Sequence, residues 1–500
     1  MLTFLVYVPR YNLSWLNIIV PSLYISTVSF YLYTMQILTA LYKSYFGTEP
    51  QEIRKLPGAG SNRTYYRLHD NERSVIGAIG EQPEENKAFI SYTKAFMEKG
   101  LPVPELLAVN EDNTAYLLED LGDASLADML FKEKEYDEKG EVYQYLKMAL
   151  RDLAKFQTIG HEGLDYSVAF PTDRFDKQAI LWDLNYFKYC FLKPADIPFR
   201  EELLEKDFLS LCRDIEALPS DFFMFRDFQS RNIMIKDDEL RYIDYQGGRK
   251  GPCAYDVVSL LYQARADIPQ HVRDEMLEYF ISINSDSLGQ TATAFRAGFD
   301  KVVLLRTLQV LGAYGFRGLV ESKLHFVKSI PFAVKNLKRL IAKEKLWRDF
   351  PQLNQVCEFI AANERFQTLE HKEGLTIHLS SFSYMKGYPV DPGLNGGGFV
   401  FDCRALPNPG RLPEYKQLTG MNQPVIDYLE EYDEVSAFVE NAWNLVKPAV
   451  ENYLERGFNN LSVAFGCTGG QHRSVYCAEQ LKRRINDHFD VTIDFLHREQ

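Results

Sequence analysis

Three polar side chains near the middle of the chain have the types and spacing that phosphoryl transfer requires. Asp227 and Asn232 lie five residues apart, and Asp244 follows after a short apolar strand and a turn. Phosphoryl transfer needs a carboxylate that orients or deprotonates the attacking hydroxyl, and oxygen ligands for Mg²⁺ that neutralise charge on the phosphates. The pattern predicts that Asp227 is the catalytic carboxylate and that Asn232 and Asp244 bind Mg²⁺.

A glycine-containing loop in the last part of the chain has the composition of an anion-binding site. The segment Gly466–Ser474 reads GCTGGQHRS, follows an apolar strand and opens a helix. Backbone N–H groups at a helix start bind anions, and Arg473 can pair with phosphate through two hydrogen bonds. Cys467 and Arg473 also have the Cys-x5-Arg spacing of a phosphatase loop with a nucleophilic thiolate. Because no acid carboxylate is identifiable, a non-catalytic role for Cys467 is favoured, and the phosphatase interpretation stays as the alternative.

The elements around the first group follow the order of an α+β fold. Strands come first, and the chain from Leu126 to about Ala342 is rich in helix, interrupted by two short apolar strands. The predicted early elements are strands within 51–68 and 73–79 joined by a turn at Asp70, a helix over 84–99, and a strand over 115–119. The two later strands are predicted at 233–235 and 242–243.

The glycine-containing loop belongs to a separate region with alternating strands and helices. A charged stretch, Lys343–Asp349, precedes Pro351 and marks a boundary, and residues 352–367 have the pattern of a connecting helix. Alternation of strands and helices beyond Leu375 indicates an α/β domain. Its predicted strands cover 375–379, 399–401 and 461–465, and its predicted helices cover 434–456 and 472–485.

Length and composition limit the possible classes of protein. A chain of 500 residues is too long for one hydrophobic core and indicates two to four domains. The net charge of −13 argues against a nonspecific nucleic-acid binder, which needs a basic surface. The seven cysteines are scattered, contain no CxxC pair and show no zinc spacing, so they fit a reducing, cytoplasmic compartment.

The amino-terminal residues differ in composition from the rest of the chain. No charged side chain occurs from Tyr11 to Tyr42, a length that would suffice for a membrane span, but Pro21 lies in its middle. A poorly ordered or non-native extension is favoured over a membrane anchor. The segment from Met35 to Gly47 has the pattern of an amphipathic helix, with Gly47 as its carboxyl-terminal cap.

The first large region resembles the aminoglycoside phosphotransferase/choline kinase-like family of the protein-kinase fold. The resemblance covers about residues 36–345 and rests on the loop Arg226–Asn232 and on the segment Ile243–Gly247. Both are most similar to those of the anomeric kinases of N-acetylmuramate and N-acetylglucosamine. The resemblance implies ATP and Mg²⁺ as cofactors. It also implies nucleotide contacts from a phosphate-covering turn and from a hinge that holds adenine through its backbone. The implied residues are Gly58, Gly60 and Ser61 in the turn, and Glu119 and Asp120 in the hinge.

Two positions depart from that family's pattern. The catalytic loop usually begins with histidine, where this chain has Phe225. The strand lysine that holds the α- and β-phosphates is missing from Ser74–Ile79, although Glu85 resembles the glutamate that pairs with it. These departures favour an alternative in which a degenerate kinase fold serves as a binding or scaffold module.

The last region resembles the C-terminal domain of the RNase adapter protein RapZ over about residues 374–486. The motifs are Ser380–Tyr384, Phe401–Pro409, Leu418–Gly420 and the loop Gly466–Ser474. In that family the domain binds glucosamine-6-phosphate and mediates oligomerisation. The P-loop domain of RapZ is absent here, so its RNA-linked role is not carried over. The resemblance implies a phosphate site formed by Thr468, Gly469, Gly470, His472, Arg473 and Ser474, with Asp402 and Arg404 as candidates for the sugar or the loop.

These observations predict an α+β protein-kinase-like bilobal fold followed by a separate α/β domain. The predicted bounds are 1–35 for the extension, 36–345 for the kinase-like domain, 346–373 for a helical linker and 374–500 for the phosphosugar domain. The expected function is ATP-dependent phosphorylation of a hydroxyl on an amino sugar or cell-wall sugar. The expected partners are that sugar, a phosphorylated amino sugar at the second domain and a second copy of the chain, with no nucleic acid.

Overall fold

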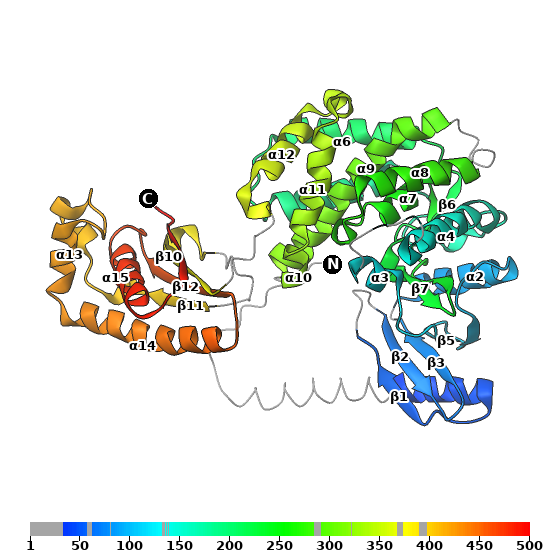
Figure 1. The fold of residues 1–500 in the computed structure, drawn as a ribbon, viewed down its shortest axis with the longest axis horizontal. Coiled ribbons are helices and arrows are strands. Elements are labelled where there is room, and N and C mark those ends of the chain that lie inside the picture. Colours follow the sequence, from blue (N-terminus) through cyan, green and yellow to red (C-terminus); the bar gives the residue numbers. More distant parts are fainter. Residues whose placement is uncertain are drawn as a thin grey trace. The chain divides into compact units, whose positions relative to one another are not determined.

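The computed structural model describes residues 34–500 except 58–62, 81, 133–135, 137, 139, 285–291, 322, 368–373 and 390–397. The chain divides into two compact units (Figure 1). The first unit is made of three segments of the chain: the part up to Lys188, Pro198–Val310 and Phe332–Ala362. The second unit is made of Tyr189–Ile197, Leu311–Pro331 and Asn363–Gln500. The predicted extension lies outside the described residues up to position 33. None of the described helices combines the length and the apolar content that crossing a membrane would take.

The first unit begins with a five-stranded antiparallel sheet in the order β1-β2-β3-β5-β4. The segment predicted as strand over 51–68 contains two strands, and the turn at Asp70 is confirmed, since its carboxylate accepts the N–H of Arg73 at 2.9 Å. The strands are β1 (Glu52–Lys55), β2 (Thr64–His69), β3 (Ser74–Ile79), β4 (Leu106–Val109) and β5 (Ala115–Glu119). Helix α2 (Pro83–Glu98) follows β3 as predicted.

A helix over residues 34–46 packs its apolar face against this sheet. Leu38 and Tyr42 are fully buried in a cluster with Leu68 of β2. A Cβ atom on Gly77 would lie 2.8 Å from Leu38 and 2.7 Å from Leu68, so glycine allows the helix to approach the sheet closely. Gly47 ends the helix with φ +77°, which confirms its predicted role as a cap.

The remainder of the chain up to residue 362 is mostly helical, as predicted. Two short antiparallel ribbons interrupt it: β7 (Ile233–Lys236) pairs with β8 (Glu239–Tyr242), and β6 (Phe222–Met224) pairs with β9 (Arg249–Gly251). The second ribbon was not predicted. The helices are α3 (Leu126–Lys132), α4 (Glu141–Lys155), α5 (Lys177–Phe187), α6 (Glu201–Glu216), α7 (Ala254–Leu261), α8 (Gln270–Asn284), α9 (Ala292–Tyr314), α10 (Leu324–Val327), α11 (Ile330–Ile341) and α12 (Pro351–Ala362).

Helix α12 occupies the first part of the segment predicted as a helical linker. The N–H of Leu353 donates to the Asp207 carboxylate on α6 at 2.8 Å. Leu353, Cys357 and Ile360 are fully buried. Because burial of this apolar face stabilises it against α6, the helix is part of the first unit and does not bridge between the two.

The second unit contains a four-stranded parallel sheet in the order β11-β12-β10-β13. The strands are β10 (Thr376–Ser383), β11 (Gly398–Asp402), β12 (Asn460–Cys467) and β13 (Thr492–His497), with helices α13 (Gln423–Glu430), α14 (Asp433–Glu455) and α15 (Arg473–His488). The predicted strands and helices are confirmed, and β13 and α13 were missed. The register pairs Ser383 with Cys467 and Asp402 with Gly466, so the carboxyl ends of three strands meet at one edge. In parallel α/β sheets this edge is where ligands bind.

Candidate active site and anion loop

The catalytic loop begins where β6 ends and is held by one buried carboxylate. Asp256, in the first turn of α7, accepts the N–H of Phe225 at 2.6 Å and the N–H of Arg226 at 2.9 Å. Arg226 has φ +74°, and its side chain donates to Asp183 of α5 at 2.8 Å. Asp256 therefore anchors the loop, and Arg226 forms a structural ion pair with Asp183.

Phe225, which stands where the family has histidine, lies in the centre of an aromatic cluster. Its side chain is fully buried, and its ring centroid is 5.1 Å from Phe156, 5.1 Å from Phe228 and 5.4 Å from Phe223. The ring supports the loop by packing, so the loop keeps its position without a histidine. Phe225 therefore does not by itself indicate a degenerate site.

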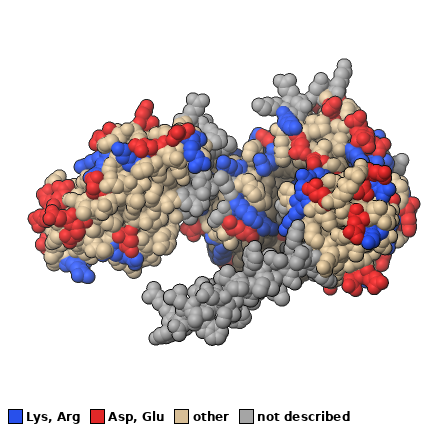
Figure 2. Space-filling view, turned by 90° about the horizontal axis from the view of Figure 1, so that it is seen from below, with Lys and Arg blue, Asp and Glu red and all other residues tan. Residues whose placement is uncertain are grey.

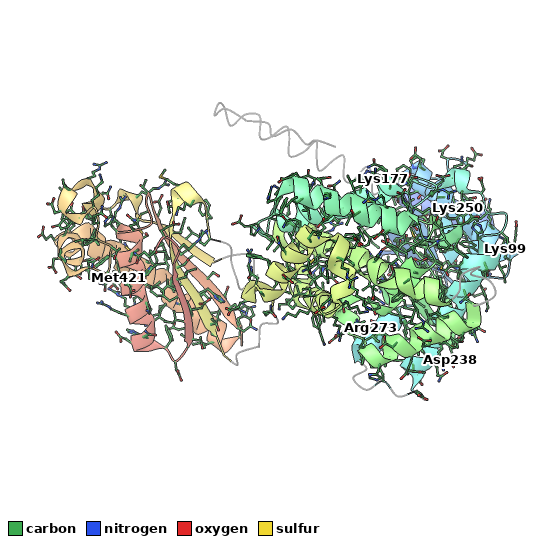
Figure 3. The ribbon with its side chains drawn as sticks, turned by 90° about the horizontal axis from the view of Figure 1, so that it is seen from above. Lys99, Lys177, Asp238, Lys250, Arg273 and Met421 are labelled. Atoms are coloured by element: carbon green, nitrogen blue, oxygen red, sulfur yellow. The ribbon has the colours of Figure 1, made fainter. Side chains whose placement is uncertain are left out.

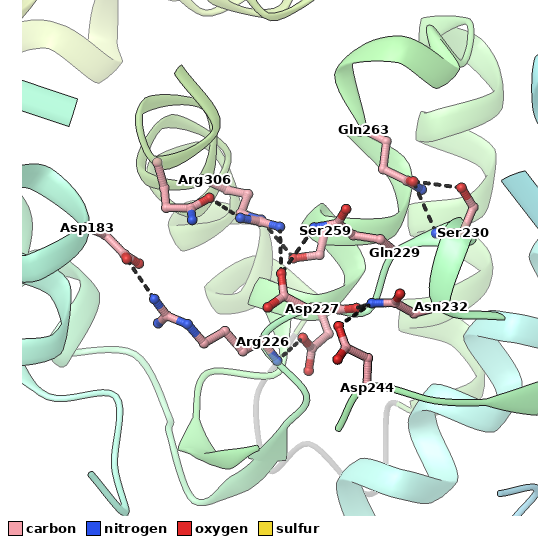
Figure 4. Close-up of polar contacts among 12 residues, drawn as sticks. Asp183, Arg226, Asp227, Gln229, Ser230, Asn232, Asp244, Ser259, Gln263 and Arg306 are labelled. Atoms are coloured by element: carbon pink, nitrogen blue, oxygen red, sulfur yellow. Dashed lines mark hydrogen bonds and ion pairs between the residues drawn. The ribbon is translucent and has the colours of Figure 1, made fainter. Parts of the chain in front are cut away.

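The three residues predicted for phosphoryl transfer converge around one amide group (Figure 4). The Nδ2 atom of Asn232 donates to the backbone oxygen of Asp227 at 2.9 Å and to Oδ2 of Asp244 at 3.1 Å. Gln229 donates to Oδ1 of Asp227 at 3.1 Å, and Gln246 donates to Oδ1 of Asp244 at 2.7 Å. The side chain of Asp227 is 41% exposed, which leaves it accessible to an acceptor hydroxyl.

The charges at this site favour a bound cation. Burial raises the pKa of Asp244, and the neighbouring Asp227 carboxylate raises it further. A divalent cation would relieve this repulsion, and carboxylate and amide oxygens are ligands that Mg²⁺ accepts. Among the described residues no cluster of three or more His, Cys, Asp or Glu could hold a metal ion by itself. Asn232 and Asp244 thus fit a Mg²⁺ ion that takes its other ligands from phosphates and water.

Arg306 of α9 is a charged neighbour of the catalytic carboxylate that the sequence did not point to. Its Nη2 atom lies 3.5 Å from Oδ1 of Asp227, and its Nε atom donates to Ser259 at 3.1 Å. It also donates to Gln309, and its guanidinium lies 5.6 Å from the Tyr255 ring centroid. This arginine therefore places positive charge beside Asp227 and fixes one side of the site.

The predicted hinge is held by ion pairs of its side chains. Glu119 pairs with Lys236 of β7 at 2.6 Å, and the same ammonium donates to the backbone oxygen of Asp120 at 3.0 Å. The Asp120 carboxylate pairs with Arg67 of β2 at 2.7 Å. These contacts fix the segment between β5 and the helical part. The adenine contact assigned to the backbone of Glu119 and Asp120 stays a prediction.

Glu85 of α2 has a cationic partner that is not a lysine. Its Oε2 atom lies 3.3 Å from Nη2 of Arg63, the residue before β2. This arginine was not singled out from the sequence, because the family's cation is expected on β3. The turn residues Gly58, Gly60 and Ser61 lie outside the described residues.

In the second unit, the loop after β12 is closed by internal hydrogen bonds. The Cys467 thiol is buried and accepts the N–H of Gly470 at 3.2 Å, and its sulfur lies 3.1 Å from Oγ of Ser474. The backbone oxygen of Thr468 accepts the Ser383 hydroxyl from β10 at 2.6 Å. Cys467 thus holds the loop together.

His472 and Arg473 connect this loop to neighbouring segments. Nε2 of His472 lies 3.0 Å from the backbone oxygen of Tyr415. Nη1 of Arg473 donates to the backbone oxygens of Arg404 at 2.8 Å and of Leu406 at 3.0 Å. The buried Arg473 therefore ties the loop to the segment after β11, and the phosphate contact expected of its guanidinium stays a prediction.

Asp402 and Arg404 lie at the end of β11 and pair with each other. Nη2 of Arg404 is 2.7 Å from Oδ2 of Asp402, and its guanidinium lies 4.1 Å from the Tyr384 ring centroid. This ion pair lowers the pKa of Asp402 below its usual value. Both are partly exposed, at the edge where the Gly469 backbone faces open space. The structure therefore gathers these candidates at one sheet edge.

Comparisons with known proteins agree with this division. Residues 52–290 match the family model of the phosphotransferase enzyme family, and residues 375–500 match that of the RapZ C-terminal domain. The chain thus contains one region similar to the phosphotransferase enzyme family and a second region similar to the RapZ C-terminal domain. Both sequence resemblances are confirmed at the level of these families, as is the protein-kinase-like fold class with a separate α/β domain.

Curated relatives match about a quarter of the chain. The chain is 36% identical over 134 residues to a nucleotide-binding protein of Solibacter usitatus, covering 27% of this chain and 40% of that protein. It is 46% identical over 121 residues to one of Azoarcus, covering 24% and 40%. The chain therefore spans about two fifths of the length of these relatives.

A solved ethanolamine kinase of Plasmodium vivax has 12% identity and a TM-score of 0.42, covering 58% of this chain and 82% of that one.

Proposed function

We propose that this protein is an ATP- and Mg²⁺-dependent kinase that phosphorylates a hydroxyl of an amino sugar or a cell-wall sugar. The observation that carries this proposal is the convergence of Asp227, Asn232 and Asp244 around one amide group. Asp227 would orient the attacking hydroxyl and take its proton, while Asn232 and Asp244 would hold a Mg²⁺ ion that offsets the charge on the nucleotide phosphates.

The sugar class rests on the resemblance of the loop Arg226–Asn232 to that of the N-acetylmuramate and N-acetylglucosamine kinases. We also propose a cytoplasmic location, since the seven cysteines are free thiols and a reducing compartment would keep them so.

The test is turnover of Mg·ATP by the full chain in the presence of a panel of amino sugars that includes N-acetylmuramate and N-acetylglucosamine. Asp227→Asn should lower kcat roughly 10²- to 10⁴-fold, because an amide cannot take the proton of the attacking hydroxyl. Asp244→Asn should lower turnover and raise the Mg²⁺ concentration needed for half-maximal turnover, because it removes an anionic ligand.

Asp238→Asn is the matched control, since this exposed aspartate lies in the turn between β7 and β8 (Figure 3). It should leave turnover unchanged. If the wild type transfers phosphate from ATP to no sugar and binds no Mg·ATP in calorimetry, the protein is a scaffold with a degenerate kinase fold.

For the second unit we propose a binding site for a phosphorylated amino sugar such as glucosamine-6-phosphate. Support comes from the strand edge at which the loop Thr468–Ser474, Asp402 and Arg404 gather. The loop leads into the amino end of α15, where the helix dipole and backbone N–H groups favour an anion. Oligomerisation through this domain is part of the same proposal.

Calorimetry with glucosamine-6-phosphate tests this site and separates it from a phosphatase. Arg473→Ala should weaken binding roughly 10- to 100-fold. It removes a charged side chain and its hydrogen bonds to the backbone oxygens of Arg404 and Leu406. Cys467→Ser should change binding little, and no inorganic phosphate should be released. Arg456→Ala, on the exposed end of α14, is the control. Release of phosphate by the wild type, lost in Cys467→Ser, would establish the phosphatase instead.

Coupling between the two sites is tested by binding alone. Nucleotide should change the affinity for glucosamine-6-phosphate by the same factor by which glucosamine-6-phosphate changes the affinity for nucleotide. If both affinities are independent, the second unit does not regulate the kinase.

A further inference from the structure

The segment that follows β10 carries two very exposed apolar side chains. The strand ends at Ser383, and a short helical turn, Tyr384–Lys386, follows it. Met385 is 81% exposed and Tyr388 is 66% exposed, the two highest values for large apolar side chains in the part of the chain that the structure describes. Single exposed apolar residues are common on protein surfaces, but two of them in one short segment indicate a contact surface.

The exposed ring of Tyr388 is held by other aromatic rings. Its centroid lies 5.5 Å from that of Tyr384, with the planes at 88°, and 5.8 Å from that of the fully buried Phe382. The two supporting rings pack over Gly466 at the end of β12, where a Cβ atom would lie 2.4 Å from Tyr384 and 2.5 Å from Phe382. Because the ring is already held in place, a ligand that packs on it would cost little side-chain entropy.

The same support joins Tyr388 to the loop after β12. The hydroxyl of Ser383, the residue before Tyr384, donates to the backbone oxygen of Thr468 in that loop at 2.6 Å. The Arg404 guanidinium lies 4.1 Å from the Tyr384 ring centroid. These contacts bring an exposed aromatic ring, a loop that leads into a helix and a guanidinium to one edge of the sheet.

We propose that Tyr388 forms the wall on which the sugar ring of a phosphorylated amino sugar packs while the loop after β12 binds its phosphate. This rests on the phosphosugar site proposed above for the second unit. A pyranose carries C–H groups on its faces and hydroxyls at its rim, so an aromatic ring can cover a face and leave the rim to polar side chains. Tyr388 would thereby favour a sugar phosphate over free phosphate.

The size and charge of the surface fit a small ligand better than a second copy of the chain. A stable interface between proteins takes roughly 20–30 residues a side, whereas Met385 and Tyr388 are only two. Lys386, which lies between them in the sequence, is 70% exposed and pairs with Glu499. Lysine is depleted at protein interfaces.

The test compares two ligands that share a phosphate but not a sugar. Calorimetry on the full chain measures glucosamine-6-phosphate and inorganic phosphate with the wild type, Tyr388→Ala and Tyr388→Phe. The wild type should bind the phosphosugar more tightly than phosphate. Tyr388→Ala should bind the phosphosugar roughly 3- to 10-fold more weakly and phosphate with unchanged affinity, because only the ring contact is lost. Tyr388→Phe keeps the ring and should retain the wild-type affinity.

Tyr45→Ala is the matched control. This tyrosine is also exposed, at 48%, and its ring also makes an edge contact, with Phe46, but it lies in the helix over 34–46 of the first unit. The affinities of this variant for both ligands should equal those of the wild type.

The outcomes separate the role of Tyr388 from the phosphosugar site itself. Equal losses for both ligands in Tyr388→Ala would overturn that role, since the ring would then act on the structure of the loop. Unchanged affinity for the phosphosugar would also overturn it, and a lower oligomeric state of the variant in sedimentation would then assign the surface to contact between copies. A wild type that binds phosphate as tightly as the phosphosugar overturns the sugar wall and leaves the anion loop standing. A wild type that binds neither ligand overturns both.

Discussion

Asp256 allows the link between burial, charge and the catalytic loop to be tested directly. Its carboxylate is fully buried and is the acceptor for the N–H groups of Phe225 and Arg226. We consider Asp256→Asn, which keeps the shape of the side chain and one acceptor oxygen, but cannot ionise. A free N–H left without a partner in a buried position costs about 1–3 kcal/mol.

The change in the free energy of unfolding with pH can be given a more definite size. Burial raises the pKa of Asp256 from 3.8 to about 7, with a smaller contribution from Asp227. The folded state therefore keeps the proton that the unfolded state releases above about pH 4, so stability falls as pH rises. A shift of this size corresponds to about 4 kcal/mol, most of which is lost between about pH 4 and pH 7, and the loss ends above the folded pKa.

The side chain at position 256 of the Asp256→Asn variant does not titrate. The difference in stability between the two proteins therefore contains the pH dependence of the Asp256 carboxyl and not that of the other groups. The stability advantage of the wild type should shrink by about 3–4 kcal/mol from pH 4 to pH 7. Hydrogen exchange of amides within residues 222–262, corrected for the intrinsic rate at each pH, measures this difference locally. Asp238→Asn, at an exposed position, should follow the wild type. Parallel pH curves for Asp256→Asn and the wild type would refute the assignment of a neutral carboxyl to this site.

Two further substitutions test the packing that positions the site. Phe225→His restores the residue usual in the family. It should lower stability by about 1–3 kcal/mol without raising turnover, because it buries a polar ring among Phe156, Phe223 and Phe228. A more active variant would show that histidine has a chemical role here. Gly77→Val should lower the unfolding temperature and expose the helix over 34–46 to proteolysis, since its Cβ would overlap with packed leucine side chains; an unchanged protein would mean that the helix contributes little to the fold. Gly247→Ala, where a Cβ meets open space, is the control.

The sequence alone was sufficient for the elements and residues that depend on local patterns. Alternation of apolar residues predicted most strands, and Gly47 marked the end of the first described helix. Asp227, Asn232 and Asp244 were found because they lie within 17 positions of each other, before and after one short ribbon, so their spacing fixes their proximity. Helix α12 was predicted as a helix, but its apolar face could not reveal which unit it would pack against.

The tertiary structure decided which distant residues complete these local patterns. Asp256 binds the loop across 30 and 31 positions, and Arg306 reaches Asp227 across 79. Arg63, which directly precedes β2, pairs with Glu85 across 22 positions. Arg473 is bound to backbone oxygens 67 and 69 positions away. A long cationic side chain leaves no periodic signal of its partner in the sequence, because its guanidinium lies several bonds from the backbone and its contacts depend on how separate elements pack.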